Sequence, residues 1–155
     1  MRRCIELKIT ARIVSANNAV AAAVATLVIR NNQLLLGKRI KNGQFIGWQC
    51  PGGYLQEGKS IEESARYYCL DKAGIEISDT QTGPYTNNIF TQQHEALHTV
   101  TLYLIARHHQ VTNEVLFYGR TNCWDWFSIE DLPEPLFLPL KLLQENNDLS
   151  QLIHI

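Results

Sequence analysis

The residues most able to do chemistry gather in one stretch, between Gly52 and Lys72. This stretch mixes carboxylates, the oxygen ligands that Mg²⁺ takes in proteins, with ammonium groups, which bind phosphate oxygens as point charges. Its acids and lysines are Glu57, Lys59, Glu62, Glu63, Asp71 and Lys72. The carboxylates could hold a metal ion, and the ammonium groups could pair with an anionic ligand.

A capped helix is the element that must position these side chains. Ser60, with Glu63 three residues later, matches the capping box of a helix N-terminus, and Gly74 is a natural C-terminal stop. The apolar positions of this segment recur every four residues and share one face: Ile61, Ala65, Cys69 and Ala73. The Pro-Gly-Gly run at 51–53 can continue neither a helix nor a strand, so the chain must turn sharply before the helix.

The other elements follow from apolar and β-branched runs. Residues 20–29 form a continuous run typical of a strand that is buried on both faces, followed by turn chemistry at Asn31-Asn32. We expect further strands at 33–39, 75–77, 99–106 and 124–127, a loop at 42–53, a capped turn of helix at 128–132 and a final helix at 136–145. The prediction is one α/β domain over residues 1–155, with a mixed β-sheet sandwiched between helices.

Length and composition fit a single globular domain. The chain has 155 residues, of which 45% are hydrophobic and 19% charged, enough for one core and unlike a disordered chain. Its 14 Lys and Arg against 15 Asp and Glu give a formal net charge of -1. This balance excludes a general polyanion binder and a polybasic membrane arm, so we expect neither a nucleic acid polymer nor a membrane as a partner.

The cysteines and the N-terminal region indicate a cytoplasmic protein. Four cysteines are scattered without a CxxC pair, which favours reduced thiols and argues against zinc ligation. The apolar run near residue 20 is shorter than the ~20 residues of a membrane span. Charged residues also separate this run from Arg2 and Arg3, so we interpret it as a buried strand and not as a signal peptide.

The segment from Gly53 to Ile75 resembles the Nudix box, Gx5Ex7REUxEExGU, in which U is an apolar residue. Gly53 opens the pattern, Cys69 occupies its inner apolar position, and Gly74-Ile75 closes it at the correct spacing. The resemblance extends to residues 34–39, Trp48 and residues 98–101, 123–127 and 132–140. The C-terminal segments are similar to the nucleoside-triphosphate diphosphatase branch of this MutT-type superfamily. The resemblance implies the Nudix fold and cleavage of nucleoside diphosphates linked to another group, with carboxylates holding Mg²⁺ as the cofactor.

Most acidic positions of the box carry other residues in this chain. Lys59 stands at the loop glutamate, Tyr67 at the arginine, and Tyr68 at the glutamate that follows it. In the final acidic pair, the first position is Asp71 and the second is Lys72. Because Tyr68 and Lys72 lie at i and i+4 on one helix face, where the box places a metal-binding pair, we expect the standard Mg²⁺ site to be absent.

Two functions remain open on this basis. In the first, Lys59 and Lys72 both point into the former metal pocket, and the protein binds a nucleotide-type ligand with absent or atypical hydrolysis. In the second, a rearranged set of acids holds Mg²⁺, and the protein is an active nucleoside triphosphate diphosphatase or nucleotide-sugar hydrolase. Both lysines also fit a solvated surface, and Glu63 also fits a purely structural role in capping. No sequence feature supports a homodimeric structural protein without a ligand.

The candidate site residues follow from these alternatives. The candidate catalytic residues are Glu57, Glu63, Asp71 and His98. The candidate substrate-binding residues are Arg39, Gly52, Gly53, Lys59, Tyr68, Lys72, Thr101, Phe137 and Leu138. The expected partner is a small-molecule nucleotide or nucleotide derivative, and a homodimer stays open.

Several of these candidates lie outside the box. Arg39 matches an arginine that lies near the substrate phosphates in the family. His98 could act as a base or contact a ligand because histidine titrates near neutral pH, although a histidine on a strand is more often structural. Phe137, together with Leu138 and Trp48, could line a nucleobase pocket, because bases stack on flat or apolar surfaces.

Overall fold

The computed structural model describes residues 19–91, 97–108 and 124–154, which are organised around one sheet. The central strand is β1 (Ala21–Arg30). The other strands of these ranges are β2 (Gln33–Lys41), β3 (Gln44–Gln49), β4 (Gly52–Tyr54), β5 (Thr80–Phe90), β6 (Leu97–Arg107) and β7 (Trp124–Ser128). Their helices are α2 (Ile61–Ala73), α3 (Leu138–Asn146) and α4 (Leu149–Ile153).

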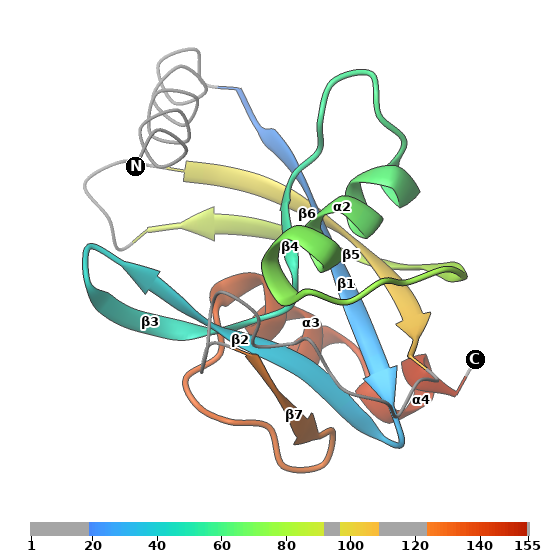
Figure 1. Ribbon diagram of the computed structural model, residues 1–155. Helices are drawn as coiled ribbons and strands as arrows, with labels where there is room; N and C mark the ends of the chain where they lie inside the picture. Colours follow the sequence, from blue (N-terminus) through green and yellow to red (C-terminus); the bar gives the residue numbers. More distant parts are fainter. Residues whose placement is uncertain (1–18, 92–96, 109–123, 155) are drawn as a thin grey trace.

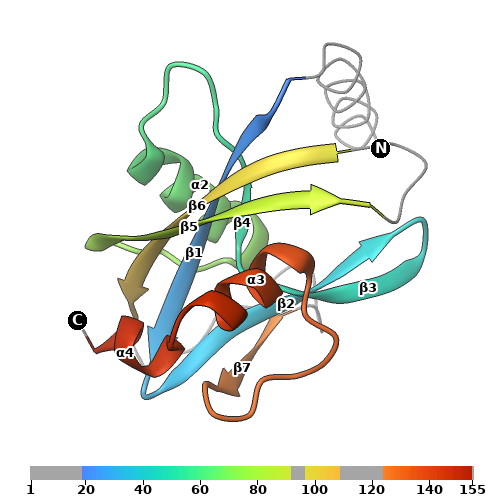
Figure 2. The same ribbon diagram turned by 180° about the vertical axis from the view of Figure 1, so that it is seen from behind.

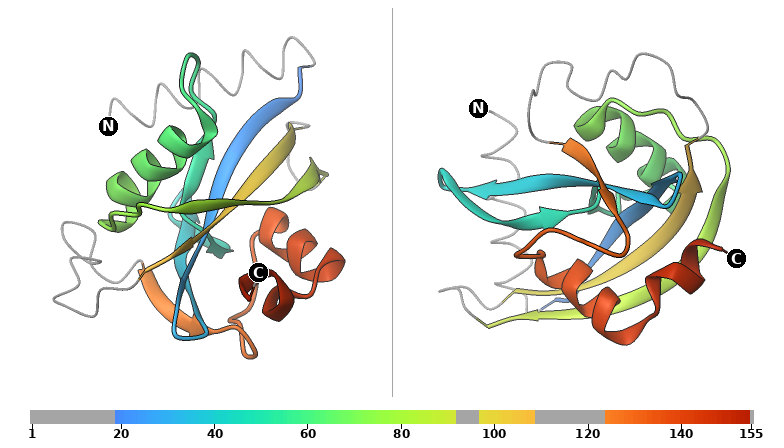
Figure 3. Two further views of the ribbon diagram at one scale, coloured as in Figure 1. Left: turned by 90° about the vertical axis from the view of Figure 1, so that its right-hand side faces the viewer. Right: turned by 90° about the horizontal axis from the view of Figure 1, so that it is seen from below.

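The sheet is mixed and lies between helices, which confirms the predicted fold class. Its strands follow the order β3-β2-β1-β6-β5, with β4 paired to β1 and β7 paired to β2. Strands β1 and β6 are parallel, whereas β1 is antiparallel to β2 and β4. Helix α2 covers one face of the sheet, and α3 and α4 cover the other (Figures 1 and 2), as the side view in Figure 3 shows.

Strand β1 separates two apolar cores, as expected for a strand buried on both faces. Val24 and Val28 face α2 and pack with its buried residues. Leu27 and Ile29 face the opposite side and pack with buried residues of α3 and α4. Because a shift of one residue would exchange these two sets, the register of β1 determines how both helical layers sit on the sheet.

Helix α2 begins and ends where the capping signals predict. The Glu63 N–H donates to Ser60 Oγ at 3.0 Å, and the Ser60 N–H donates to Glu63 Oε2 at 3.2 Å. Gly74 adopts a left-handed φ of 69° and ends the helix. The predicted apolar face is buried, and burial raises the pKa of the Cys69 thiol to about 12, so this thiol contributes to packing and not to chemistry.

The sequence prediction is wrong for two segments in the middle of the chain. Residues 42–53 contain β3 and β4 instead of a loop, because Asn42-Gly43 forms a two-residue hairpin turn with φ values of 52° and 76°. Residues 75–77 form no strand. The antiparallel neighbour of β6 is β5, which includes Gly83-Pro84 and has a register shift between Thr82 and Tyr85.

The C-terminal part also differs from its prediction. Residues 128–132 form a hydrogen-bonded turn and not a turn of helix. Helix α3 begins two residues later than expected because Leu136 and Phe137 extend alongside Trp48 of β3. Asp148 then caps the short helix α4, which the sequence pattern does not predict.

Some sequence predictions concern residues outside the described ranges. These residues include Cys4, Cys123 and everything before residue 19. Within the described ranges, Cys50 and Cys69 are free and buried, in agreement with reduced thiols. No helix of these ranges is long and apolar enough to cross a membrane.

The capping box yields a stability prediction. Replacing Ser60 with Ala removes the acceptor for the Glu63 N–H and should lower the free energy of unfolding by about 1 kcal/mol. Urea denaturation followed by circular dichroism measures this change. Ser78→Ala, at an exposed serine outside the helix, is the control and should change the stability by less than about 0.5 kcal/mol. Equal effects of the two substitutions would contradict a specific role for the cap.

Candidate functional site

The candidate site is built where α2 packs on strand β4. Gly52 and Gly53 permit this close approach: a Cβ at Gly52 would clash with the Val24 carbonyl oxygen of β1, and a Cβ at Gly53 would clash with the Tyr68 ring. The two glycines are therefore required for packing, whatever else they contact. Any larger residue at either position would separate β4 from β1 or from α2.

The carbonyl groups of β4 alternate between its two edges. The Pro51 carbonyl accepts a hydrogen bond from the Thr26 N–H of β1 at 3.0 Å. Since successive carbonyls of a strand point to opposite edges, those of Gly52 and Tyr54 point away from β1 and need other donors. Helix α2 supplies both donors through its side chains.

Lys72 and Tyr68 are these donors. The Lys72 Nζ donates to the Gly52 carbonyl oxygen, and the Tyr68 hydroxyl donates to the Tyr54 carbonyl oxygen at 2.6 Å. The ammonium group also lies 5.0 Å from the centroid of the Tyr68 ring, within the range of a cation–π interaction. The box has glutamate at both of these positions. In this chain they carry a phenol and an ammonium group that contact each other and bind the same strand.

The phenol of Tyr68 stays protonated at neutral pH. Burial raises its pKa, and the proximity of Tyr67 and of the Asp71 carboxylate raises it further. A neutral phenol donates a hydrogen bond and supplies no negative charge to a cation. Tyr68 therefore does not replace a carboxylate ligand in electrostatic terms.

The side chains between β4 and α2 do not fit the coordination of Mg²⁺. This ion requires near-octahedral coordination by oxygen atoms, usually including carboxylates. Here the Gly52 carbonyl is bound to an ammonium group, and a neighbouring positive charge would repel a divalent cation. Within the residues that the structure describes, no three His, Cys, Asp or Glu side chains are grouped so that they could hold a metal ion.

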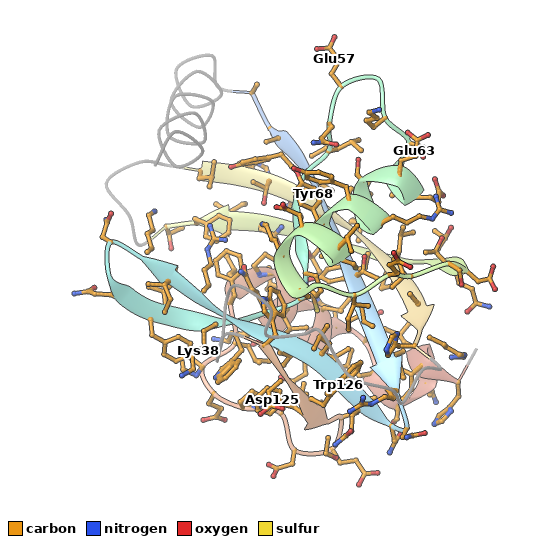
Figure 4. The ribbon with its side chains drawn as sticks, viewed as in Figure 1. Lys38, Glu57, Glu63, Tyr68, Asp125 and Trp126 are labelled. Atoms are coloured by element: carbon orange, nitrogen blue, oxygen red, sulfur yellow. The ribbon has the colours of Figure 1, made fainter. Side chains whose placement is uncertain are left out.

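The acids proposed as replacement ligands are not brought together. Glu57 is exposed at the tip of the loop before α2, and Glu63 lies near the start of the helix, away from Tyr68 in Figure 4. The Glu63 carboxylate is already bound to the Ser60 N–H of the capping box. Asp71 is half-buried in the last part of the helix. A common site for these three carboxylates is therefore not present among the described residues.

The two lysines do not converge, so the expectation of a shared pocket is wrong. Lys59 is exposed in the loop that precedes α2, whereas Lys72 lies in the last turn of the helix. Eleven residues of α2, Ile61 to Asp71, lie between them, and at 1.5 Å per residue this part of the helix rises about 16 Å. Their side chains cannot bridge that distance, which leaves Lys72 as the cation at the box.

A second cation, Arg39, lies near the end of β2. Its Nη1 donates to Gln49 Oε1 at 3.2 Å, and its guanidinium carbon is 4.4 Å from the centroid of the Phe137 ring. Burial lowers the pKa of Arg39, while the nearby Tyr54 opposes this shift. Within the described ranges, the Arg39 Nε atom is buried without a hydrogen-bond partner. A half-buried guanidinium in this situation is suited to accept an anionic ligand.

Phe137 is fixed beside Arg39 by the backbone. Its N–H donates to the Trp48 carbonyl oxygen at 2.8 Å, which holds the segment before α3 against β3. The ring also contacts Phe90 of β5, with 5.6 Å between centroids. Leu138 is the first residue of α3 and is half-buried. Trp48 itself packs between Phe45 and Phe127, so it serves the core of this region.

The remaining candidates lie on β6. Thr101 is buried, and its hydroxyl accepts a hydrogen bond from Asn88 Nδ2 of β5 at 2.9 Å, so it takes part in pairing these strands. His98 is half-buried and contacts the Asn87 side chain across the same pair of strands. A direct contact of either residue with a ligand stays a prediction.

Sequence reasoning missed three residues of this region. Gln49 binds Arg39, Tyr54 accepts the Tyr68 hydrogen bond, and Phe90 contacts Phe137. Because Tyr54 immediately follows Gly52-Gly53 in the sequence, its position could have indicated that it belongs to the site. Gln49 and Phe90 are recognised only once β3 and β5 are known as strands.

The Tyr68 hydroxyl yields a prediction with a pH dependence. Tyr68→Phe should lower the free energy of unfolding by about 1 kcal/mol at pH 7, because the Tyr54 carbonyl loses its donor. The folded-state pKa of Tyr68 is raised, so its contribution is complete below the unfolded-state pKa near 10 and declines as the pH rises above that value. The difference between wild type and variant should therefore shrink at pH 11.

Urea denaturation of both proteins at pH 7 and pH 11 measures this difference. Tyr67→Phe, at the more exposed neighbouring tyrosine, is the matched control and should have a much smaller effect at pH 7. A difference between wild type and Tyr68→Phe that grows with pH would reverse the assigned direction of the pKa shift.

Comparison with known proteins agrees with this architecture. The family model described as NUDIX domain matches residues 19–151. A MutT NUDIX hydrolase from Burkholderia pseudomallei is similar in structure with a TM-score of 0.66 and 21% identity, covering 82% of this chain and 98% of that chain. The NUDIX domain of Shewanella oneidensis NrtR, solved with ADP ribose, has a TM-score of 0.62 and 17% identity, covering 83% and 86%. A MutT protein from Bacillus halodurans has a TM-score of 0.60 and 15% identity, covering 83% and 81%.

At these identities, likeness to a solved structure concerns the fold and leaves the substrate open. The match to the family model rests on the sequence and spans most of the chain, from the start of β1 into α4. Together with the mixed sheet between helices, it shows that this chain belongs to the Nudix family.

Proposed function

We propose that this protein binds a nucleotide-type ligand through its diphosphate, with absent or atypical hydrolysis. The observation that carries the proposal is the Lys72 ammonium group bound to the Gly52 carbonyl at the box. Nudix enzymes generally use a divalent metal, and in this chain a fixed side-chain cation stands among residues that do not fit one. A cytoplasmic location, where soluble nucleotides are available, is part of the proposal.

The two cations of the site border the same residue. Lys72 and Tyr68 are bound to the backbone of β4 at Gly52 and Tyr54, and Arg39 of β2 lies close enough to Tyr54 for this tyrosine to affect its pKa. A diphosphate that lies along β4 would therefore meet an ammonium group and a guanidinium group. The ammonium acts as a point charge, and the guanidinium can donate two parallel hydrogen bonds to phosphate oxygens.

Aromatic residues beside Arg39 suit the rest of a nucleotide. Phe137 and Phe90 place two rings next to the guanidinium, and a nucleobase can stack on such surfaces. The NrtR domain among the similar structures was solved with ADP ribose, which contains a diphosphate between two sugars. This relative supports the ligand class by analogy of fold and does not identify the base or sugar.

The residue types at positions 68 and 72 favour binding without efficient hydrolysis. Hydrolysis of a diphosphate requires a general base that takes a proton from the attacking water molecule. A lysine ammonium group is already protonated, and a neutral tyrosine hydroxyl is too weak a base for this role. Lys72 and Tyr68 can stabilise phosphate charge but cannot activate the water. The alternative, an active hydrolase with rearranged acids, predicts a Mg²⁺-dependent product and is tested by the same experiment.

The ligand proposal is tested by thermal shift with ADP ribose, nucleoside diphosphates and nucleoside triphosphates. We expect at least one of these to raise the melting temperature by the same amount in EDTA and in excess Mg²⁺, because the bound cations belong to the protein. Chromatography of the incubated ligand should detect no new product. Mg²⁺-dependent release of a monophosphate or pyrophosphate would instead establish the hydrolase.

The role of Lys72 is tested by Lys72→Met, which keeps most of the side-chain length and removes the charge. The dissociation constant of the best ligand should rise about tenfold or more, since a charge-assisted contact contributes roughly 1.5–3 kcal/mol. Calorimetric titration measures this change, and Lys72→Arg should retain part of the affinity. Lys141→Met, at an exposed lysine of α3, is the matched control and should bind as the wild type does. Equal affinity of Lys72→Met and wild type would remove the basis of the proposal.

A further inference from the structure

Helix α2 covers only part of the sheet face on which it packs. Val24 and Val28 of β1 and Leu104 of β6 lie on this face and are buried with the apolar side chains of α2. The start of β6 and the end of β5 extend past the helix, toward the left of Figure 1. Among the residues that the structure describes, no helix lies over these strand ends. This part of the face is thus left open by the described helices.

The open part of the face is made by side chains of three neighbouring strands. Strand pairing places Ala22 beside Val100 and Val100 beside Asn87, and side chains two residues away on each strand point to the same face. Tyr85 is 69% exposed and Ile89 is 56% exposed. We call this surface the open face; its residues are Val20, Ala22, Tyr85, Asn87, Ile89, His98, Val100 and Leu102.

The two sides of β5 have the reverse of the usual polarity. Thr86 and Asn88 are buried on the side of α3, whereas Tyr85 and Ile89 point to the open face. Asn88 Nδ2 donates on the buried side to two threonine hydroxyls of β6. A strand with one solvated side normally exposes its polar residues there. Large apolar side chains on the exposed side of β5 therefore indicate a surface that a partner covers.

Charge favours a second copy of this chain as the partner. The residues of the open face include no Asp, Glu, Lys or Arg, so they offer nothing to attract a charged peptide or a nucleic acid. Burial of apolar side chains is then the driving force, which requires an apolar surface on the other side. The open face of a second copy is such a surface. Because the formal net charge of the chain is -1, two copies repel each other only weakly.

The spacing of the residues fits a two-fold contact of the open face with itself. In such a contact, residue i meets residue j of the partner and residue j meets residue i. Tyr85 and Ile89 lie two residues before and after Asn87 on β5. An axis through Asn87, parallel to the face and perpendicular to the strands, would therefore bring the Tyr85 ring over Ile89 of the partner subunit. The same axis stacks each strand on its own counterpart, as in sheets that pack face to face.

We propose that the open face is the contact surface of a weak homodimer of this protein. Three strands about 4.8 Å apart and five residues of about 3.3 Å each give a footprint of roughly 14 Å by 17 Å. This footprint is well below the ~800 Å² per partner of a standard stable complex. The dimer therefore dissociates readily, with a dissociation constant above about 1 μM.

Sedimentation equilibrium of the full chain, in reducing buffer at concentrations up to about 1 mM, tests the proposal. We expect reversible dimers of the wild type. Ile89→Lys places an ammonium group in the contact and should raise the dissociation constant about tenfold or more. Ile40→Lys is the matched control, because Ile40 is 53% exposed on β2 outside the open face. A wild type that stays monomeric, or equal weakening by both substitutions, would overturn the proposal.

The two-fold geometry has its own test with a pair of variants. Tyr85→Glu should weaken the dimer as Ile89→Lys does. A mixture of the two variants should associate more tightly than either variant alone, because a mixed dimer sets the new ammonium group against the new carboxylate and keeps one original contact between Tyr85 and Ile89. A mixture that associates no more tightly than the separate variants would contradict the two-fold contact.

Thermal unfolding at low concentration separates a dimer contact from cover within one chain. Circular dichroism should show that Ile89→Lys and Ile40→Lys are both folded, with similar melting temperatures, since each isoleucine is exposed in the single chain. If Ile89→Lys instead lowers the melting temperature of the monomer far more than Ile40→Lys does, another segment of the same chain covers the open face. That result would overturn the assignment to a second copy.

Discussion

The site depends on how the outward-facing carbonyl groups of β4 are satisfied. Gly52 and Tyr54 are two residues apart on a strand, so their carbonyls are about 6.6 Å apart along one edge. Lys72 and Tyr68 are four residues apart on α2, a rise of about 6 Å on one face. The two spacings match, which lets one helix face donate to both carbonyls at once. This match fixes the axial position of α2 against the sheet.

The same geometry explains why the residue types at positions 68 and 72 matter so much. A carboxylate cannot donate to a carbonyl oxygen, so an acidic pair at these positions would place negative groups against the negative ends of two carbonyl dipoles. A cation between them would be required to make the arrangement favourable. Lys72 and Tyr68 donate directly, so the helix closes on β4 through the chain's own hydrogen bonds. Among the residues that the structure describes, the contact between α2 and β4 is thus made by hydrogen bonds of the chain itself.

The sequence predicted those parts of the fold that local signals determine. Ser60, Glu63 and Gly74 define α2 because capping is a local hydrogen-bonding problem. The run around Val24 identifies the central strand, since its continuity reflects burial on both faces. Strand β5 was missed because its interior contains Gly83-Pro84, and its strand conformation is imposed by pairing with β6.

The candidate site was predictable in its residue types but not in its distances. The spacing of the box identified Tyr68 and Lys72 as neighbours on one face, and the structure places them together. One separation was available from the sequence, because the capping signals at Ser60 and Gly74 set the length of the helix that lies between Lys59 and Lys72. The partners of Arg39 come from β3 and from the segment before α3, so they are brought together only by tertiary structure.

Among the strands that the structure describes, β5 lies at one edge of the sheet, and its interruption affects how the molecule behaves in a crowded solution. An edge strand with a regular ladder of free backbone groups is a template on which strands of other molecules can add. Pro84 lacks a backbone N–H, and the register shift between Thr82 and Tyr85 bends the ladder at the same place. The irregularity that hid β5 from sequence reasoning thus protects this edge against intermolecular strand pairing and aggregation.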